Sequence, residues 1–474
     1  MGGMILTMKS SGVYLPLEIY AREYLSKMIL AVVIANENIA VSIGDKNAVI
    51  RVALKSKLPG VFFEKSSKAD LGMAHLEQLK KKFFKIVAQD EESGISFSNI
   101  NNFATERFFK NINFFDKFFC WGKRDFDFIE STFQFRNIEL TGSPRTVLWG
   151  DLGYIYWERD IVNIKAMSGE FILIVSNLSF ANGILTPEEI NSIQRQFGGQ
   201  LHTEEYIDRY SQFEYLSFMK VLEIIQLILD RTSFNVIVRL HPTEKKSEVW
   251  ENVFGKNGRV IISSEGEVDP YVLASNSIIH TSSTVAYQAI AAGIPTYSID
   301  QFISLSENLT TLPNSFSIRA ENLEELCLLI SQNTKNSKES ESSIQSELIH
   351  NIGSLNSVNA ITEVIKDLIE EIECLSGAKR FQLSQINFLL RIELAIRSCK
   401  AKLGFLLGRH HKKGKINFND LGILKRPEIK IEKIKIDIEK ICHLLMIKNE
   451  FIVQERGGGC FLIFKTSHQG KAIE

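Results

Sequence analysis

Short apolar runs that end in polar residues recur along most of the chain, and amphipathic stretches separate them. "GVFFEKS" (60–66), "FILIVSNLSFANG" (171–183) and "FNVIVRLHP" (234–242) are three such runs. The stretches between them repeat apolar residues every three or four positions, as residues 16–36 and 211–232 do, which predicts helices. Strands that alternate with helices and exit into polar residues are typical of a parallel sheet covered by helices. The sequence therefore predicts an α/β fold.

The alternation occurs in two series, which predicts two Rossmann-like domains facing a cleft. We expect the first domain over residues 1–160 and the second over 161–345, joined by a linker near 154–170. Residues 346–474 are expected to form a mainly helical C-terminal extension. Within it, residues 427–447 alternate isoleucine with charged residues, so strand and helix compete, and helix is favoured for the second half.

Composition and charge exclude several classes of protein. A chain of 474 residues is too long for one core, and 45% hydrophobic residues can fill more than one. The formal net charge of −1 argues against a nucleic-acid binder, which needs a basic face. Six cysteines without a CxxC pair favour free thiols in a reducing compartment over disulfides or a zinc site. Because the chain starts without a signal-peptide core and the apolar run 28–35 is shorter than a membrane span, we expect a cytoplasmic protein.

The first candidate site lies in the second half of the segment "VIVRLHPTE" (236–244). Pro242 ends the strand, because proline has no N–H to donate. Arg239 and His241 alternate with Leu240, so both side chains can point to one side at the carboxyl edge of the sheet, where ligands bind in open α/β folds. A cationic pair there suits a phosphate, but a surface arginine and a capping histidine fit the pattern equally well. Glu244 lies beyond the proline and has no predicted role.

The second candidate site is the hydroxyl cluster in "IIHTSSTVAYQAIAAGIP" (278–295). An apolar run ends at His280, and four hydroxyl residues, Thr281 to Thr284, precede a helix expected over 285–292. Hydroxyl side chains cap the free N–H groups of a helix, and the same N–H groups can bind an anion. A plain cap needs one hydroxyl rather than four, so the excess favours phosphate binding.

Two further segments have both a structural and a functional interpretation. The acidic turn at Asp90, Glu91 and Glu92 could supply a carboxylate for glycosyl transfer, but on the sequence alone a solvated turn is favoured. The basic helix expected over 379–415 could lie on an anionic membrane surface at the inner membrane, and a packing helix with a solvated basic end is at least as consistent. No metal-binding constellation, Walker loop or GxGxxG pattern is visible, so no metal and no cofactor are expected.

Taken together, these segments resemble the motifs of two-domain GT-B glycosyltransferases that use cytidine-nucleotide donors, such as capsule Kdo transferases and polysialyltransferases. The resemblance is strongest to bacterial surface carbohydrate (polysaccharide) biosynthesis proteins. Its motifs occur in the expected order over most of residues 10–300: "YLPLEIYARE" (14–23), "DEESG" (90–94), "GSPR" (142–145), "SNLSFANG" (176–183), "RLHP" (239–242) and "HTSSTVAYQAIAAGIP" (280–295).

The resemblance implies that the second domain binds a nucleotide sugar and the first binds the acceptor. Arg239 and His241 would contact the nucleotide phosphate or the sugar carboxylate, and this cationic pair would stabilise the leaving phosphate together with the helix terminus, in place of a metal. Pro242, His280 and Thr281 belong to the same expected site, in which Ser282, Ser283 and Thr284 cradle the phosphate. Related helices often carry a glutamate that binds ribose, but this chain has Gln288, which makes the donor less certain.

The resemblance also favours the catalytic interpretation of the acidic turn, with Glu91 or a neighbour as the catalytic carboxylate. The implied activity is metal-independent transfer of a Kdo-like or nonulosonic acid from a CMP donor onto a surface glycan such as capsule or lipopolysaccharide. One alternative is a sugar-nucleotide epimerase of the same fold, although those proteins usually have glycines where this chain has Ser282 and Ser283. A second alternative is a catalytically silent partner that binds nucleotide or glycan in an assembly complex.

Overall fold

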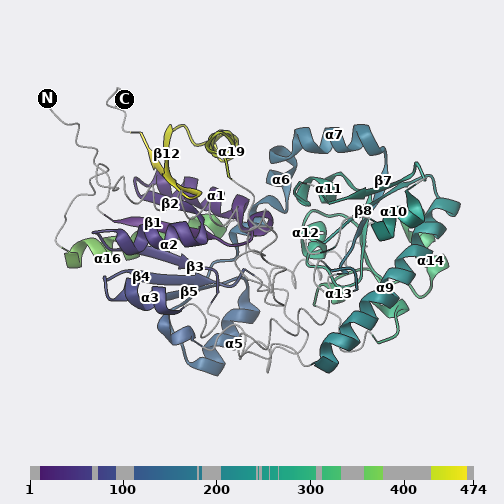
Figure 1. Ribbon diagram of the computed structural model, residues 1–474, viewed down its shortest axis with the longest axis horizontal. Coiled ribbons are helices and arrows are strands. Elements are labelled where there is room, and N and C mark those ends of the chain that lie inside the picture. Colours follow the sequence, from purple (N-terminus) through teal and green to yellow (C-terminus); the bar gives the residue numbers. More distant parts are fainter. Residues whose placement is uncertain are drawn as a thin grey trace, which may run out of the picture. The chain divides into compact units, whose positions relative to one another are not determined.

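Figure 1 shows the computed structural model, in which the chain divides into two compact units. The described residues of the first unit lie within 11–147 and 357–466, and those of the second within 148–332. The boundary therefore falls at residue 147 instead of 160, and residues 357–466 belong to the first unit instead of forming a separate extension. The structure describes residues 11–66, 73–91, 111–178, 181–183, 204–241, 244, 248–255, 257–264, 266–305, 312–332, 357–376 and 429–466.

The first unit is built on an eight-stranded sheet with the order β12-β13-β2-β1-β3-β4-β5-β6. Strands β1 to β6 are parallel, so their carboxyl ends share one edge. These six strands are β1 (Gly12–Leu17), β2 (Ala40–Asp45), β3 (Gly60–Glu64), β4 (Lys85–Gln89), β5 (Lys117–Cys120) and β6 (Ile138–Leu140).

Strand β1 corrects the prediction of one helix over 16–36. It lies between β2 and β3 and all six of its residues are buried, whereas helix α1 begins only at Tyr20 and ends at Asn36. A central parallel strand is apolar on both faces, so its sequence has no alternation that would separate it from the buried helix that follows.

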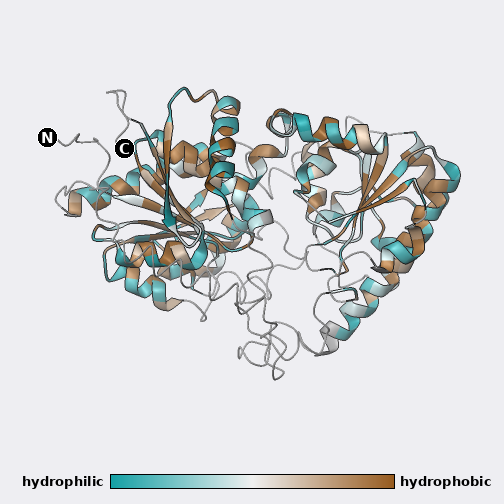
Figure 2. Ribbon diagram, turned by 45° about the horizontal axis from the view of Figure 1, so that its top comes forward, coloured by the Kyte–Doolittle hydropathy of each residue, from teal (hydrophilic) through white to brown (hydrophobic). Residues whose placement is uncertain are grey.

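Helices cover this sheet, and Figure 2 shows their hydrophobic residues turned towards the apolar strands. Helix α1 packs against β2 and β13 and also contacts α16 (Ser357–Ser376) and α19 (Ile431–Leu444). The run 28–35 is therefore a core segment of α1 that is enclosed on several sides, which explains why it lacks a polar face. Helices α2 (Lys46–Lys55) and α3 (Met73–Lys80) pack together beside β1 and β4, and α5 (Lys123–Phe133) packs against β5 and β6.

The end of the described chain completes the first sheet. Strands β12 (Phe451–Gly457) and β13 (Cys460–Lys465) form a hairpin, and β13 pairs antiparallel with β2. Gly457, Gly458 and Gly459 have positive φ, which suits the glycine-only turn between the strands. The Gly459 carbonyl accepts the N–H of Asp45 at 3.0 Å, so the hairpin fixes the end of β2. Helix α19 agrees with the helix predicted for the second half of 427–447.

The second unit is built on a five-stranded parallel sheet with the order β11-β10-β7-β8-β9. Together with the first sheet, it confirms the prediction of an α/β chain with two Rossmann-like units. The strands are β7 (Phe171–Val175), β8 (Asn235–Arg239), β9 (Val260–Ser263), β10 (Ser277–His280) and β11 (Thr296–Ser298). Strands β7 and β8 lie inside the predicted runs 171–183 and 234–242, and β10 ends at His280 as expected.

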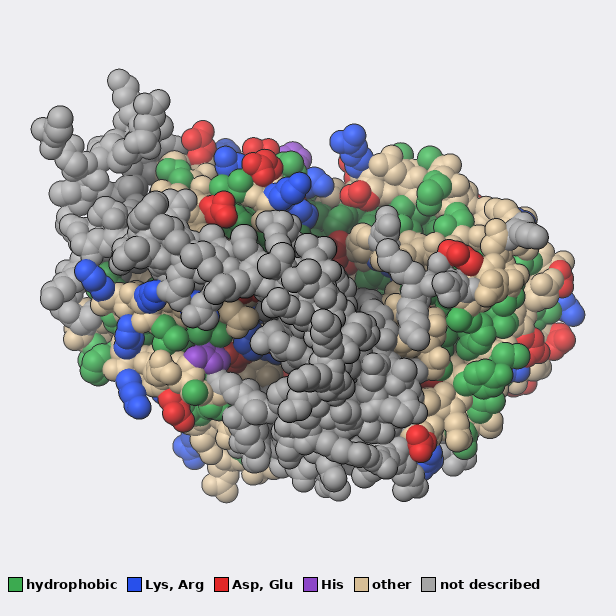
Figure 3. Space-filling view, in the orientation of Figure 1, with side chains coloured by type: hydrophobic (Ala, Val, Ile, Leu, Met, Phe, Trp, Pro, Cys, Tyr) green, Lys and Arg blue, Asp and Glu red, His purple; other side chains and the backbone are tan. Residues whose placement is uncertain are grey.

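Helices in the second unit include two where a linker was predicted. Residues 154–170 contribute to α6 (Asp151–Tyr156) and α7 (Glu158–Ser168), which pack against α11 (Asp269–Ala274). The long helix α9 (Glu204–Arg231) packs against α14 (Leu323–Ser331), and Figure 3 shows hydrophobic side chains over α9, where Tyr215 and Met219 are exposed. The remaining helices are α10 (Glu248–Phe254), α12 (Val285–Ala291) and α13 (Leu312–Ser315), with short turns η1 (Ile112–Phe114), η2 (Pro144–Leu148) and η3 (Asp300–Phe302) in the chain.

Candidate functional site

Each sheet has a point at which the strand order reverses, and ligands of open α/β folds bind outside the carboxyl ends of the strands there. In the second unit the chain runs from β7 through β8 to β9 and then returns to place β10 on the other side of β7. The reversal therefore lies between β7 and β10. In the first unit β2 and β3 flank β1, so the reversal lies between β1 and β3.

The reversal in the second sheet coincides with the predicted hydroxyl cluster. Asn177 follows β7, Ser282 follows β10, and the Asn177 Nδ2 donates to Ser282 Oγ at 3.2 Å. Asn177 also donates to the hydroxyl of Tyr210 on α9 at 3.4 Å. Two loops that are 105 residues apart in the sequence are thus joined at the place where a ligand is expected.

The hydroxyl residues 281–284, called the hydroxyl turn below, lead directly into α12. Thr281 and Ser282 are buried, whereas Ser283 and Thr284 are half-buried. Ser283 Oγ accepts the N–H of Val285 at 3.3 Å, and Thr284 makes no side-chain cap. Ser283 therefore acts as the local cap of this seven-residue helix, which leaves the hydroxyl of Thr284 outside the capping arrangement.

His280 supports the hydroxyl turn from inside the fold. Its Nδ1 accepts the N–H of Ser283 at 3.2 Å, and its Nε2 lies 2.8 Å from Ser317 Oγ. The Ser317 hydroxyl donates to the carbonyl of Pro313, so it accepts from a protonated Nε2. Burial lowers the pKa of His280 to about 4, against an opposing effect of Asp300. The prediction that His280 contacts the nucleotide does not fit this geometry, because both ring nitrogens are already bonded.

Arg239 is also engaged by its own unit. The side chain is buried, Nη1 donates to Ser263 Oγ at 3.0 Å, and Nη2 donates to the carbonyl of Gly266. Its guanidinium lies over the ring of Tyr271 at 5.0 Å. These contacts direct the Arg239 side chain towards the exit of β9.

His241 is half-buried at the exit of β8, and its backbone is fixed by Glu244. Glu244 is buried, and its Oε1 accepts the N–H of His241 at 3.0 Å. Pro242 lies outside the described residues. Gln288 on α12 is buried, and its Nε2 has no hydrogen-bond partner among the described residues, which is compatible with its predicted contact to a ligand.

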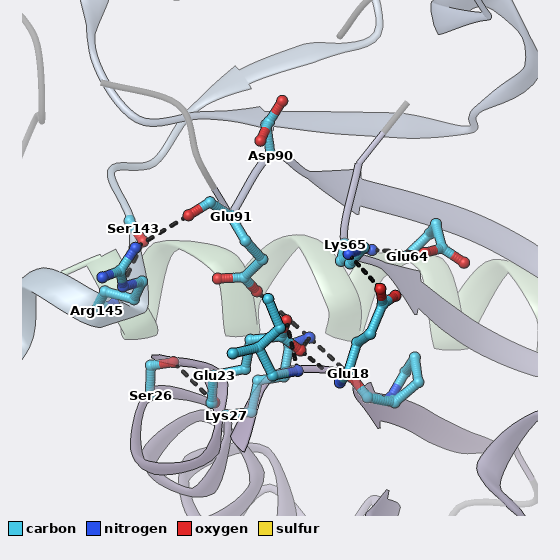
Figure 4. Close-up of polar contacts among 12 residues, drawn as sticks. Glu18, Glu23, Ser26, Lys27, Glu64, Lys65, Asp90, Glu91, Ser143 and Arg145 are labelled. Carbon is cyan, nitrogen blue, oxygen red and sulfur yellow. Dashed lines mark hydrogen bonds and ion pairs between the residues drawn. The ribbon is translucent and has the colours of Figure 1, made fainter. Parts of the chain in front are cut away.

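A buried ion network occupies the carboxyl edge of the first sheet, and Figure 4 shows its members. The Nζ of Lys27 lies 3.3 Å from Glu91 Oε1 and 3.4 Å from Glu23 Oε2, and it donates to the carbonyl of Pro16 at 2.8 Å. Glu23 also accepts the N–H groups of Glu18 and Ile19, which stabilises the start of α1. Burial lowers the pKa of Lys27, but Glu23 and Glu91 outweigh it, so the pKa is raised and the lysine stays charged.

A second part of the network lies at the reversal between β1 and β3. Glu18 follows β1 and pairs with Lys46 and Lys65, each at 2.9 Å. Burial raises the pKa of Glu18, but the two lysines lower it to about 2. Glu64 ends β3 and lies 3.7 Å from Lys46 and 3.5 Å from His75; burial again raises its pKa, but Lys46 and His75 lower it to about 2. Both carboxylates are therefore ionised at neutral pH.

The predicted carboxylates Asp90 and Glu91 follow β4 and point in different directions. Glu91 reaches towards Lys27, whereas the side chain of Asp90 points away from that network (Figure 4). Both are buried, and the Asp90 carbonyl accepts the Trp121 indole N–H at 2.6 Å. Arg145 of the "GSPR" turn donates to the Glu91 carbonyl at 3.0 Å and lies over the Trp121 ring. Glu92 lies outside the described residues.

Several site residues were not singled out from the sequence. Glu18 and Glu23 lie in "YLPLEIYARE", and Glu64 and Lys65 lie in a polar strand exit, so a systematic list of strand exits would have found them. Lys27 had no such signal, because it lies inside α1, directly before the apolar run 28–35.

Among the described residues, no cluster of three or more histidine, cysteine, aspartate or glutamate side chains could hold a metal ion. No helix in the part of the chain that the structure describes is both long and apolar enough to cross a bilayer. The basic segment 379–415, for which membrane contact was one interpretation, lies outside the described residues.

Comparisons with known proteins give only distant likenesses. No protein-family model matches the chain, and no curated protein sequence matches it. Among solved structures, UDP-GlcNAc 2-epimerase of Methanocaldococcus jannaschii has 14% identity and a TM-score of 0.46, covering 75% of this chain and 99% of that one. A UDP-N-acetylglucosamine 2-epimerase from Listeria monocytogenes has 12% identity and a TM-score of 0.48, with coverages of 80% and 100%. The wall teichoic acid polymerase TagF has 11% identity and a TM-score of 0.38, with coverages of 66% and 72%.

These likenesses carry no conclusion about activity, because every TM-score among them is below 0.5. The family suggested by the sequence motifs stays a prediction.

Proposed function

We propose that the chain is a glycosyltransferase that uses a nucleotide-sugar donor, with the donor bound by the second unit. The observation that carries the proposal is the hydrogen bond between Asn177 and Ser282, because it places the hydroxyl turn at the reversal of the second sheet. Ser283 and Thr284 are half-buried there, at the start of α12, and His241 leaves the neighbouring strand β8. Hydroxyl and N–H groups together suit a nucleotide phosphate.

The donor that the motifs favour is a CMP-linked Kdo-like or nonulosonic acid, and the acceptor is a bacterial surface glycan. His241 stabilises the leaving phosphate in this scheme, so no metal is needed for that step. Arg239 contributes by holding the exits of β8 and β9 together rather than by touching the donor. Gln288 can donate a hydrogen bond to a donor hydroxyl, because its amide is buried without a partner among the described residues.

The acceptor side of the proposal lies at the carboxyl edge of the first sheet. A general base must be able to take a proton from an acceptor hydroxyl. The Glu91 carboxylate is held 3.3 Å from the Lys27 ammonium group, whereas the Asp90 side chain points away from that lysine. We therefore assign the base to Asp90 and assign Glu91 to the ion network that fixes the end of β4.

Release of CMP from CMP-Kdo and CMP-nonulosonic acids, with and without glycan acceptors, tests the proposal. We expect His241→Ala to reduce acceptor-dependent CMP release by roughly 100-fold or more, since one stabilising group at a developing charge is worth about this much. The substitution keeps the backbone N–H that donates to Glu244, so the loop should persist. His443→Ala on α19 is the matched control and should keep the wild-type rate.

Asp90→Asn and Glu91→Gln separate the two carboxylates. Asp90→Asn should lose transfer while the protein stays folded, and Glu91→Gln should mainly lower stability. Isomerisation of the donor without an acceptor would identify an epimerase instead, and binding without turnover of any donor would identify a silent partner. Either result would overturn the proposed transferase.

A further inference from the structure

The carboxylate of Glu244 joins the loops that leave the neighbouring strands β7 and β8. Its Oε1 accepts the N–H of His241 at 3.0 Å and the N–H of Leu178 at 3.2 Å. The N–H of Glu244 donates to the His241 carbonyl at 2.9 Å, and Glu244 also forms an isolated antiparallel bridge with Gly183. One side chain therefore fixes the backbone at two adjacent strand exits.

The loop after β7 extends this connection to the hydroxyl turn. Leu178 is bonded to Glu244, and its neighbour Asn177 donates to Ser282 Oγ at 3.2 Å. A continuous path thus runs from His241 through Glu244 and residues 177–178 to Ser282. It links the two motifs that were predicted to bind one phosphate.

The turn between His241 and Glu244 does not by itself require a buried carboxylate at position 244. The residue is only 5% exposed, and its Oε2 has no hydrogen-bond partner among the described residues. A buried carboxylate is costly unless both oxygens are satisfied, and an asparagine or serine can close a tight turn without that cost. A longer side chain is needed, however, to reach both His241 and the loop after β7.

We propose that Glu244 is a positioning residue that fixes His241 and the hydroxyl turn relative to each other, so that both contact the phosphate of one nucleotide. The inference rests on the proposed function for its nucleotide, but the coupling between the two loops is a property of the fold. It gives a role to the residue of "RLHPTE" for which the sequence supplied none.

Hydrogen–deuterium exchange on the full chain tests the coupling without a substrate. In Glu244→Ala, exchange should rise by about tenfold or more at Leu178 and His241 and also across the hydroxyl turn. Glu244→Gln keeps the Oε1 acceptor and should restore protection at all three places.

The matched control is Glu214→Ala on α9. Glu214 is a buried carboxylate that holds the same loop through the N–H of Ala181, at 2.8 Å. This variant should raise exchange at Ala181 and leave His241 unchanged. If it exposed His241 as Glu244→Ala does, the effect would be general loosening of the loop, and the positioning role would be refuted.

CMP binding, measured by calorimetry, is the second readout. We expect Glu244→Gln to bind CMP within about threefold of the wild type and Glu244→Ala to bind it at least about tenfold more weakly. Unchanged CMP affinity in a folded Glu244→Ala protein would overturn this inference alone. A wild-type protein that binds neither CMP nor UMP would overturn the proposed function and, with it, the role of Glu244 towards a nucleotide.

Discussion

Removing the charge of Lys27 is the most direct test of the ion network in the first unit. The lysine side chain is 3% exposed, and its Nζ lies 3.3 Å from Glu91 and 3.4 Å from Glu23. At an effective dielectric constant of about 20, each contact is attractive by roughly 5 kcal/mol before the cost of desolvation. Desolvation cancels much of this gain, but Lys27→Met leaves two buried carboxylates without their cation. We therefore expect a loss of about 3–5 kcal/mol in the free energy of unfolding.

The loss should depend on pH in a defined direction. A buried carboxylate without a countercharge costs less in its neutral form, which acid favours. A group of this kind stabilises the folded state at low pH and loses that contribution as pH rises through its folded pKa. The cost of Lys27→Met should therefore be larger at pH 8 than at pH 5. The double variant Lys27→Met, Glu91→Gln has one buried charge fewer than Lys27→Met. It should therefore recover part of the stability at pH 8.

Urea unfolding of the variants at both pH values measures these effects, and Lys123→Met is the control. Lys123 lies 2.7 Å from Asp127, a shorter distance than either contact of Lys27, but the two side chains are 60% and 49% exposed. Its loss should cost less than about 1 kcal/mol, because water screens the pair. Equal costs for Lys27→Met and Lys123→Met, or a cost that does not change with pH, would refute the argument from burial.

Two further predictions concern His280 and the C-terminal hairpin. The neutral His280 contributes stability above its unfolded pKa of about 6.5 that is lost as pH falls towards its folded pKa of about 4. The cost of His280→Asn in urea unfolding should therefore shrink between these values, by on the order of 3 kcal/mol, and a constant cost would contradict the neutral buried ring. Gly44→Ala should destabilise the first unit by roughly 3 kcal/mol in thermal unfolding, because the added Cβ would lie 1.9 Å from the Gly459 carbonyl oxygen at φ +142°. Gly258→Ala, where nothing lies within 4 Å, is its control and should be neutral within about 1 kcal/mol.

The sequence predicts a strand or helix correctly where the segment itself carries a clear apolar pattern. Strands β3, β7, β8 and β10 all lie within runs that stop at polar residues, and α9 follows its three- and four-residue spacing. The pattern fails for β1, which is buried on both faces, and for the hairpin at 451–465. The hairpin pairs with β2 more than 400 residues away, and no local signal specifies that partner.

The candidate site was also predicted only in part. The sequence located polar residues at strand exits but not their hydrogen-bond partners. Alternation along β8 and the hydroxyl excess after β10 placed His241 and Ser282 at one edge of one sheet, and both do leave strands at that edge. Whether a polar residue at a strand exit is free for a ligand depends on partners from elsewhere in the chain. Arg239 donates hydrogen bonds to Ser263 and Gly266, and His280 is bonded to Ser317. None of these three partners belongs to a recognisable sequence motif.

These partners divide the predicted site into two groups. The side chains of His280 and Arg239 form hydrogen bonds inside the second unit, and Glu91 pairs with Lys27 inside the first. His241, Ser283 and Thr284 form the second group and are half-buried at strand exits. The hydrogen bonds of Glu244 and Asn177 connect the loops that carry both kinds of residue. If the proposed function holds, we expect the half-buried group to contact the phosphate, in a geometry that Glu244 and Asn177 set.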